Sequence, residues 1–146
     1  MIAVVVGSDF AISHYKLCEA ILYINSGCEF IASNKDRFSG LAHRKVPTNG
    51  PIVKLIESAT GVQATLMGKP SLLLFELIRE EHKLENTSLD DFLMVGDNLE
   101  TDGKFGSLNG ISTLCVMSGV ASMPQIERIV IYKRYDEETE MIPTYV

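Results

Sequence analysis

The chain has 146 residues, of which 46% are hydrophobic and 22% charged, so it suits one domain or two small packed units and excludes extended disorder. Its formal net charge of −6 excludes the clustered positive charge that nucleic acids and anionic membranes attract, and we expect neither as a partner. Its three cysteines form no Cys-x-x-Cys pair, and the apolar run at 2–6 is too short for a signal peptide or a membrane span. We therefore expect a cytoplasmic protein.

The first third of the chain predicts a strand, a helix and a second strand. The β-branched run at 2–6 is typical of a buried strand, and 14–25 carries apolar side chains at helical spacing after a plausible Ser13 N-cap. Residues 28–32 predict the second strand, so these elements form a parallel crossover unit. The polar stretch 33–50 then predicts a long loop.

The rest of the chain alternates between helices and strands. The predicted helices are 51–60, 71–83, 100–108 and, more weakly, 124–130, and the predicted strands are 63–67, 92–95 and 112–117. This alternation predicts an α/β class with a parallel sheet.

Charged residues follow two of the predicted strands. Lys69 follows the strand at 63–67, and Asp97 follows the strand at 92–95. If these strands are neighbours, both side chains lie at the sheet edge where α/β proteins bind ligands. A lysine there can hold a phosphate and a carboxylate can hold Mg²⁺. The alternative remains open that Gly96-Asp97-Asn98 is only a turn and helix cap, with Asp102 favouring the helix dipole.

Several motifs resemble the haloacid dehalogenase (HAD) superfamily, in particular its branch of 4-nitrophenylphosphatases, phosphoglycolate phosphatases and NagD proteins. The stretches that carry the resemblance are GKPS at 68–71, MVGDNLETD at 94–102, TL at 113–114 and SGV at 118–120. Upstream stretches agree with the same branch, namely VVVGSD at 4–9, YKLCEA at 15–20, FIASNKD at 30–36 and VPTNG at 46–50.

The resemblance implies a fold and a reaction. The fold would be α/β, with residues 1–63 as part of an α/β cap domain and residues 64–146 as the C-terminal half of a Rossmann-like HAD core with a parallel sheet. The reaction would be Mg²⁺-dependent hydrolysis of small phosphate monoesters through an aspartyl-phosphate. By this resemblance Lys69 binds phosphate and Asp97 is a metal ligand. Asp102 would orient the site without itself binding the metal or the phosphate.

The resemblance also implies the choice of substrate and partner. The stretch before residue 50 would be the part of the cap that reaches over the active site, so Asn34, Asp36, Arg37 and Ser39 are candidates for a specificity loop, although a solvated loop is an equal alternative. The substrate would be a small phosphorylated metabolite. A homodimer through the cap is a possible assembly, since caps of this branch contribute to dimers.

One motif of the family is missing. The nucleophile and general acid of these enzymes lie in an Asp-x-Asp motif, and no Asp-x-Asp occurs in the 146 residues. Because the nucleophile and the general acid are missing, we expect the isolated chain to lack phosphatase activity. We also expect it to be poorly stable, because the strand at 92–95 would expose an apolar edge. The alternative is a non-catalytic binding or dimerisation protein derived from such a phosphatase.

Overall fold

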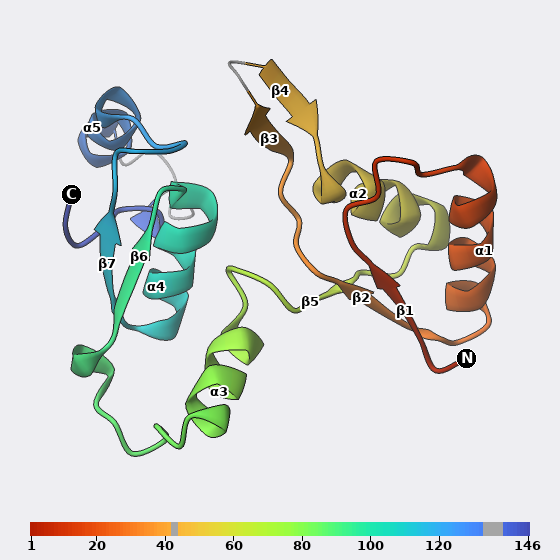
Figure 1. Cartoon of the computed structure of the whole chain (residues 1–146), viewed down its shortest axis with the longest axis horizontal. Helices are drawn as coiled ribbons and strands as arrows, with labels where there is room; N and C mark the ends of the chain where they lie inside the picture. The colour runs from red at the N-terminus through yellow and green to blue at the C-terminus, as the bar shows by residue number, and fades with distance from the viewer. Residues whose placement is uncertain (42–43, 133–138) are drawn as a thin grey trace. The chain divides into compact units, whose positions relative to one another are not determined.

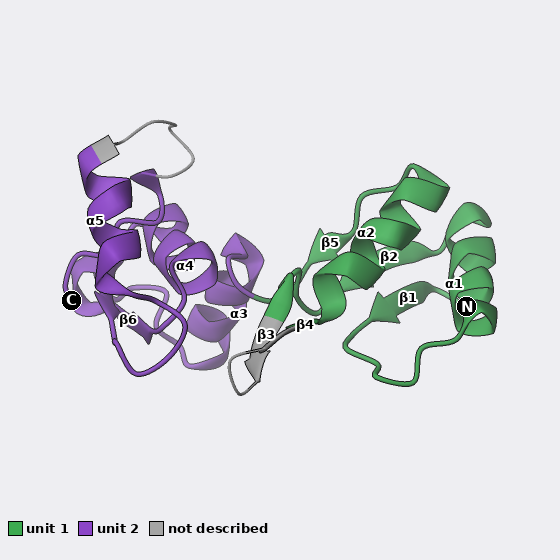
Figure 2. Ribbon diagram, turned by 90° about the horizontal axis from the view of Figure 1, so that it is seen from above, with its two compact units in different colours: residues 1–68 green, residues 69–146 purple. Residues whose placement is uncertain are grey.

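The computed structural model describes residues 1–41, 44–132 and 139–146. The chain divides into two compact units, Met1–Gly68 and Lys69–Val146, which Figure 2 colours separately. Each unit has its own parallel strand pairing and its own apolar core. None of the helices within the described ranges has the length and apolar character that a membrane span needs.

The first unit is a three-stranded parallel sheet with two helices (Figure 1). Its strands β1 (Ala3–Val6), β2 (Glu29–Ala32) and β5 (Thr65–Leu66) lie in the order β1-β2-β5, and helices α1 (His14–Asn25) and α2 (Asn49–Thr60) pack beside them. The predicted crossover and the Ser13 cap are confirmed, because the Ser13 hydroxyl accepts the Lys16 N–H at 3.3 Å. The core consists of Val6, Ile24, Phe30, Ala32, Val53, Ile56 and Ala64.

The prediction of a long loop over 33–50 is wrong. Strands β3 (Phe38–Leu41) and β4 (Arg44–Pro47) form an antiparallel hairpin inside it, and α2 begins at Asn49. A short hairpin escapes pattern analysis because its polar residues and Gly40 give no alternation of apolar side chains. Its strands are defined by their mutual backbone hydrogen bonds.

The prediction that residues 2–6 form a buried strand is only half right. Val6 belongs to the core, whereas Val5 on the opposite face is 67% exposed. Successive side chains of a strand point to opposite faces, so helices on one face cover every second residue. A continuous apolar run in the sequence does not show whether one face of the strand is covered or both. Among the described residues, only the face of β1 that carries Val6 is buried in the core.

The second unit is built around two parallel strands (Figure 1). Strand β6 (Leu93–Gly96) pairs with β7 (Ser112–Cys115). Between them run a π-helical turn, η2 (Leu99–Gly103), and helix α4 (Lys104–Asn109). Helix α3 (Leu72–Glu81) and the 3-10 turn η1 (Leu89–Asp91) precede β6, and α5 (Met123–Tyr132) follows β7. Two buried clusters form the core, one of Phe75, Phe105 and Ile111 and one of Leu99, Cys115, Ala121, Ile126 and Ile129.

Strand β6 has one hydrogen-bonded neighbour among the described residues, namely β7. On its other side the strand is an edge, and its side chains Leu93 and Val95 are 51% and 53% exposed. Beyond β7 the C-terminal segment pairs with it, since the Cys115 N–H donates to the Tyr145 carbonyl at 2.9 Å. Unpaired apolar edges favour association with another strand.

Candidate active site

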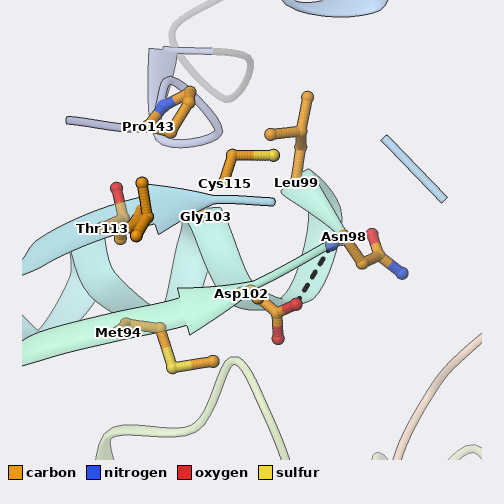
Figure 3. Close-up of a pocket in the computed structure, with 10 residues that line it drawn as sticks. Met94, Asn98, Leu99, Asp102, Gly103, Thr113, Cys115 and Pro143 are labelled. Atoms are coloured by element: carbon orange, nitrogen blue, oxygen red, sulfur yellow. Dashed lines mark hydrogen bonds between the residues drawn. The ribbon is translucent and has the colours of Figure 1, made fainter. Parts of the chain in front are cut away.

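The turn after β6 is closed by a buried carboxylate. Asp102 is 6% exposed, and its Oδ2 accepts the backbone N–H groups of Asp97 and Asn98, each at 3.0 Å. Figure 3 shows the Asp102 side chain turned toward the Asn98 amide. Gly96 is required beneath it, because a Cβ at that position would overlap the Asp102 carboxylate. The carboxylate therefore fixes the backbone that presents Asp97.

Lys69 reaches the same carboxylate from another segment. Its Nζ lies 2.8 Å from Asp102 Oδ1, and its side chain is 44% exposed. Lys69 is followed by Pro70 and by the buried Ser71, which lies directly before α3. A lysine ammonium has three donor protons, so the ion pair with Asp102 orients Lys69 while leaving donors for an anion.

The sequence left open whether the strands before Lys69 and Asp97 are neighbours, and among the described residues they belong to different sheets. Strand β5 pairs with β2 in the first unit, whereas β6 pairs with β7 in the second. Lys69 nonetheless belongs to the second unit and approaches Asp102 through the segment leading into α3. Lys69 therefore reaches Asp102 through this segment and not through the end of an adjacent strand.

Asp97 itself is held from the side of β7. Its Oδ2 accepts the Val120 N–H at 2.8 Å, and its backbone carbonyl accepts the Ala121 N–H at 2.7 Å. Within the described part of the chain, Oδ1 of Asp97 has no hydrogen-bond or ion-pair partner given by the structure. A half-buried carboxylate with one free oxygen fits a hard cation such as Mg²⁺, which takes few protein ligands.

The described residues of this region offer few carboxylate oxygens to a cation. No group of three or more His, Cys, Asp or Glu side chains with a metal-binding arrangement occurs in the described ranges. Asp102 is a poor ligand, because both of its oxygens are already engaged by Lys69 and by backbone N–H groups. Asp97 is therefore the residue that fits Mg²⁺, as a single ligand.

A small cavity lies on the inner side of the turn (Figure 3). It has room for about one water molecule, so it is too small for a substrate. Its lining includes Asp102 and Cys115 but neither Lys69 nor Asp97. Burial raises the pKa of the Cys115 thiol, and the negative charges of Asp97 and Asp102 raise it further. The thiol is therefore a packing group that stays protonated at neutral pH.

The specificity-loop candidates lie in the first unit, after β2. Asn34 Oδ1 accepts the Asp36 N–H at 3.2 Å, and the Asp36 carbonyl accepts the Gly50 N–H at 2.8 Å. The Arg37 carbonyl accepts the Thr48 N–H at 3.4 Å. Ser39 lies on β3, where the structure describes the backbone only.

Sequence reasoning missed the residues that hold this loop. Asn49 is fully buried, and its Nδ2 donates to the Asn34 carbonyl at 2.8 Å and to the Val6 carbonyl at 3.1 Å. Gly50 has no space for a Cβ, which would lie 2.5 Å from the Lys35 carbonyl oxygen. The only available signal was the Asn-Gly-Pro sequence at the start of a helix.

Glu57 ties the same loop to α2. Its buried carboxylate accepts from Lys35 Nζ at 2.8 Å and from the Ala64 N–H at 3.1 Å, and Lys54 lies 3.8 Å away. Burial alone would raise the pKa of Glu57, but the bond from Lys35, the Ala64 N–H and the nearby lysine charges outweigh it. Together they hold the pKa of Glu57 below its ordinary value.

Residues 66–142 match the model of the HAD-hydrolase-like family, and the chain belongs to that family. The α/β fold predicted from the sequence is confirmed by this match and by the solved structures that resemble the chain.

The chain is similar to chronophin and to proteins that are named as phosphatases. Chronophin of Rattus norvegicus is 32% identical over 145 residues, which are 98% of this chain and 45% of chronophin. A glycerol phosphate phosphatase of Mycobacterium tuberculosis, solved in complex with magnesium, has a TM-score of 0.78 and 29% identity, covering 98% of this chain and 40% of that one. The 4-nitrophenylphosphatase of Thermotoga maritima has a TM-score of 0.75 and 31% identity, covering 85% and 47%. The chain thus spans less than half the length of these relatives.

Proposed function

We propose that the chain is part of a Mg²⁺-dependent phosphatase that hydrolyses small phosphate monoesters. The observation that carries the proposal is the arrangement after β6, where Oδ1 of Asp97 has no partner among the described residues and Asp102 holds both the turn and the Lys69 ammonium. Support comes from the named activities of relatives, which include glycerol phosphate phosphatase and 4-nitrophenylphosphatase.

Each residue has a distinct role in this proposal. The Lys69 ammonium holds an oxygen of the phosphate group as a compact positive charge. Asp97 provides a carboxylate oxygen to Mg²⁺, and Asp102 orients Lys69 and the backbone of Asp97 from behind. When bound, Mg²⁺ offsets the negative charge that develops on the phosphoryl group. Phosphoryl transfer depends mainly on such positioning and charge stabilisation.

The attacking group lies outside these 146 residues. No Asp-x-Asp occurs in them, so the nucleophilic aspartate and the general acid of the proposed reaction come from another segment or another chain. In this proposal residues 1–63 form part of a cap and residues 64–146 the second half of the catalytic core. The loop residues Asn34, Asp36, Arg37 and Ser39 contribute to the choice of the phosphate monoester.

Complementation tests the proposal. The 146-residue chain is mixed with the N-terminal half of the Thermotoga maritima 4-nitrophenylphosphatase, which we expect to carry Asp-x-Asp, and turnover of 4-nitrophenyl phosphate is measured with Mg²⁺. We expect no turnover by either piece alone and turnover by the mixture. Association of the two pieces, measured by sedimentation, without turnover would overturn the proposal.

A pair of lysine variants tests the role of Lys69. We expect Lys69→Ala to lower turnover of the mixture about 10²- to 10³-fold, the usual effect of removing a group that stabilises transition-state charge. Lys16→Ala is the matched control, because Lys16 is also a partly exposed lysine in a 2.6 Å ion pair, with Asp9 of the first unit. Equal activities of the two variants would remove Lys69 from the site.

The exposed edge of β6 favours a second candidate function. Leu93 and Val95 leave an apolar strand surface open, and such a surface suits a non-catalytic module that associates with another protein. This alternative predicts stable association with no turnover in the complementation experiment.

A further inference from the structure

The loop that follows β7 makes three hydrogen bonds to Gly96 and Asp97. The Val116 N–H donates to the Gly96 carbonyl at 2.8 Å, the Ala121 N–H donates to the Asp97 carbonyl, and the Val120 N–H donates to Asp97 Oδ2. The first two bonds fix the backbone on which the carboxylate stands. The third fixes the carboxylate itself, so both ends of Asp97 are held by one loop.

Gly119 makes this contact possible because it has no side chain. A Cβ at position 119 would overlap the carboxylate of Asp97, with its nearest contact at Oδ2. The φ angle of Gly119 lies outside the left-handed region, so the requirement for glycine comes from space and not from backbone conformation. The carboxylate therefore lies against the bare backbone of the loop.

We propose that Gly119 and the Val120 N–H are positioning groups that engage Oδ2 of Asp97 and leave Oδ1 as the oxygen for a divalent cation. The inference rests on the proposed function for the identity of that cation. A carboxylate held by a backbone donor loses less rotational freedom when it binds a metal than a carboxylate that turns freely. Metal ligands of proteins are commonly oriented by such outer hydrogen bonds.

The test uses the 146-residue chain with Mn²⁺ as a paramagnetic probe for Mg²⁺. Mn²⁺ broadens the NMR signals of nearby amides even when it binds weakly, so broadening of the Asp97 and Val120 amides measures occupancy of the site. We expect Gly119→Ala to need about tenfold or more Mn²⁺ for the same broadening, the usual loss when a ligand's outer partner is removed. Asp97→Asn should abolish the site-specific broadening.

A second measurement follows the hydrogen bond directly. In the wild-type chain the Val120 amide should exchange its hydrogen slowly, and Gly119→Ala should speed this exchange about tenfold. Gly110→Ala is the matched control. It adds a methyl group to another glycine of the second unit, strains a turn at φ 66°, and places its Cβ 3.6 Å from Leu89 and away from Asp97. We expect it to change neither readout at Asp97 and Val120.

Several outcomes overturn the inference. It is wrong if Gly119→Ala binds Mn²⁺ as the wild type does, if Gly110→Ala weakens Mn²⁺ binding equally, or if the wild-type Val120 amide exchanges as an open amide does. The inference is also wrong if Mn²⁺ does not broaden the Asp97 amide signal of the wild-type chain. Failure of the proposed phosphatase function is a separate result, because it appears as an inactive complemented enzyme with normal Mn²⁺ broadening.

Discussion

Replacing Asp102 with asparagine should loosen the turn after β6, because it removes the negative charge while it keeps the shape of the side chain. The wild-type carboxylate accepts two backbone N–H groups through Oδ2 and pairs with Lys69 through Oδ1. Neutralising it weakens each N–H bond by about 1 kcal/mol, the difference between charged and neutral acceptors. The exposed Lys69 pair adds only about 0.5 kcal/mol, since solvent screens it.

The expected cost of Asp102→Asn is therefore about 2–3 kcal/mol, and Asp102→Ala should cost about 4 kcal/mol because it leaves two part-buried N–H donors without an acceptor. Hydrogen exchange of the Asp97 and Asn98 amides measures this locally, which avoids treating a chain of two units as a single two-state system. For the asparagine variant we expect these amides to exchange about 30- to 150-fold faster.

Lys69→Gln is the control for this reasoning, because it removes the ion pair but leaves both backbone hydrogen bonds intact. It should cost about 0.5 kcal/mol. If Lys69→Gln speeds exchange as much as Asp102→Asn, the ion pair holds the turn instead of the backbone bonds. Unchanged exchange in Asp102→Asn would refute the account of the turn altogether.

Two further predictions concern the loop held by α2 in the first unit. Gly50→Ala should destabilise that unit by about 2 kcal/mol, because the added Cβ overlaps the Lys35 carbonyl. Gly7→Ala is the control and should cost little, because its Cβ meets nothing closer than 3.6 Å. Urea unfolding followed by circular dichroism compares the two variants. Glu57→Gln should cost about 1–2 kcal/mol at pH 7. The pKa of Glu57 is lowered on folding, so its stabilisation is complete above the ordinary glutamate pKa of about 4.3 and is lost as the pH falls through the lower folded value. Wild type and Glu57→Gln should thus converge in stability on acidification, and a difference that persists below both values would contradict the sign.

The elements with strong periodicity were predicted within a few residues. Helix α1 forms at His14–Asn25 behind its Ser13 cap, and α2 ends at Gly61 in the left-handed conformation that glycine tolerates. These features depend on neighbouring residues alone. The β3–β4 hairpin was missed because its strands are held by pairing with each other.

The sequence predicted which residues form the candidate site, but it did not predict the contacts between them. Lys69, Asp97 and Asp102 were selected from short motifs, and the structure brings Lys69 and Asp102 within 2.8 Å. Whether the preceding strands are neighbours was left open, because strand pairing is decided by contacts between distant segments. Asn49 and Gly119 lie in the short motifs Asn-Gly-Pro and Ser-Gly-Val, but these motifs do not reveal their roles, which come from what lies against them in space.

By itself the sequence determined the α/β alternation, the family motifs and the absence of Asp-x-Asp within these residues, because each is a property of local pattern or residue identity. Only the tertiary structure decided that both carboxylate oxygens of Asp102 have partners, whereas Oδ1 of Asp97 has none within the ranges that the structure describes. It also decided that β6 has an open apolar edge in the described part of the chain. The physical reason is that hydrogen bonds, space and exposure depend on segments far apart in the chain, which no local pattern encodes.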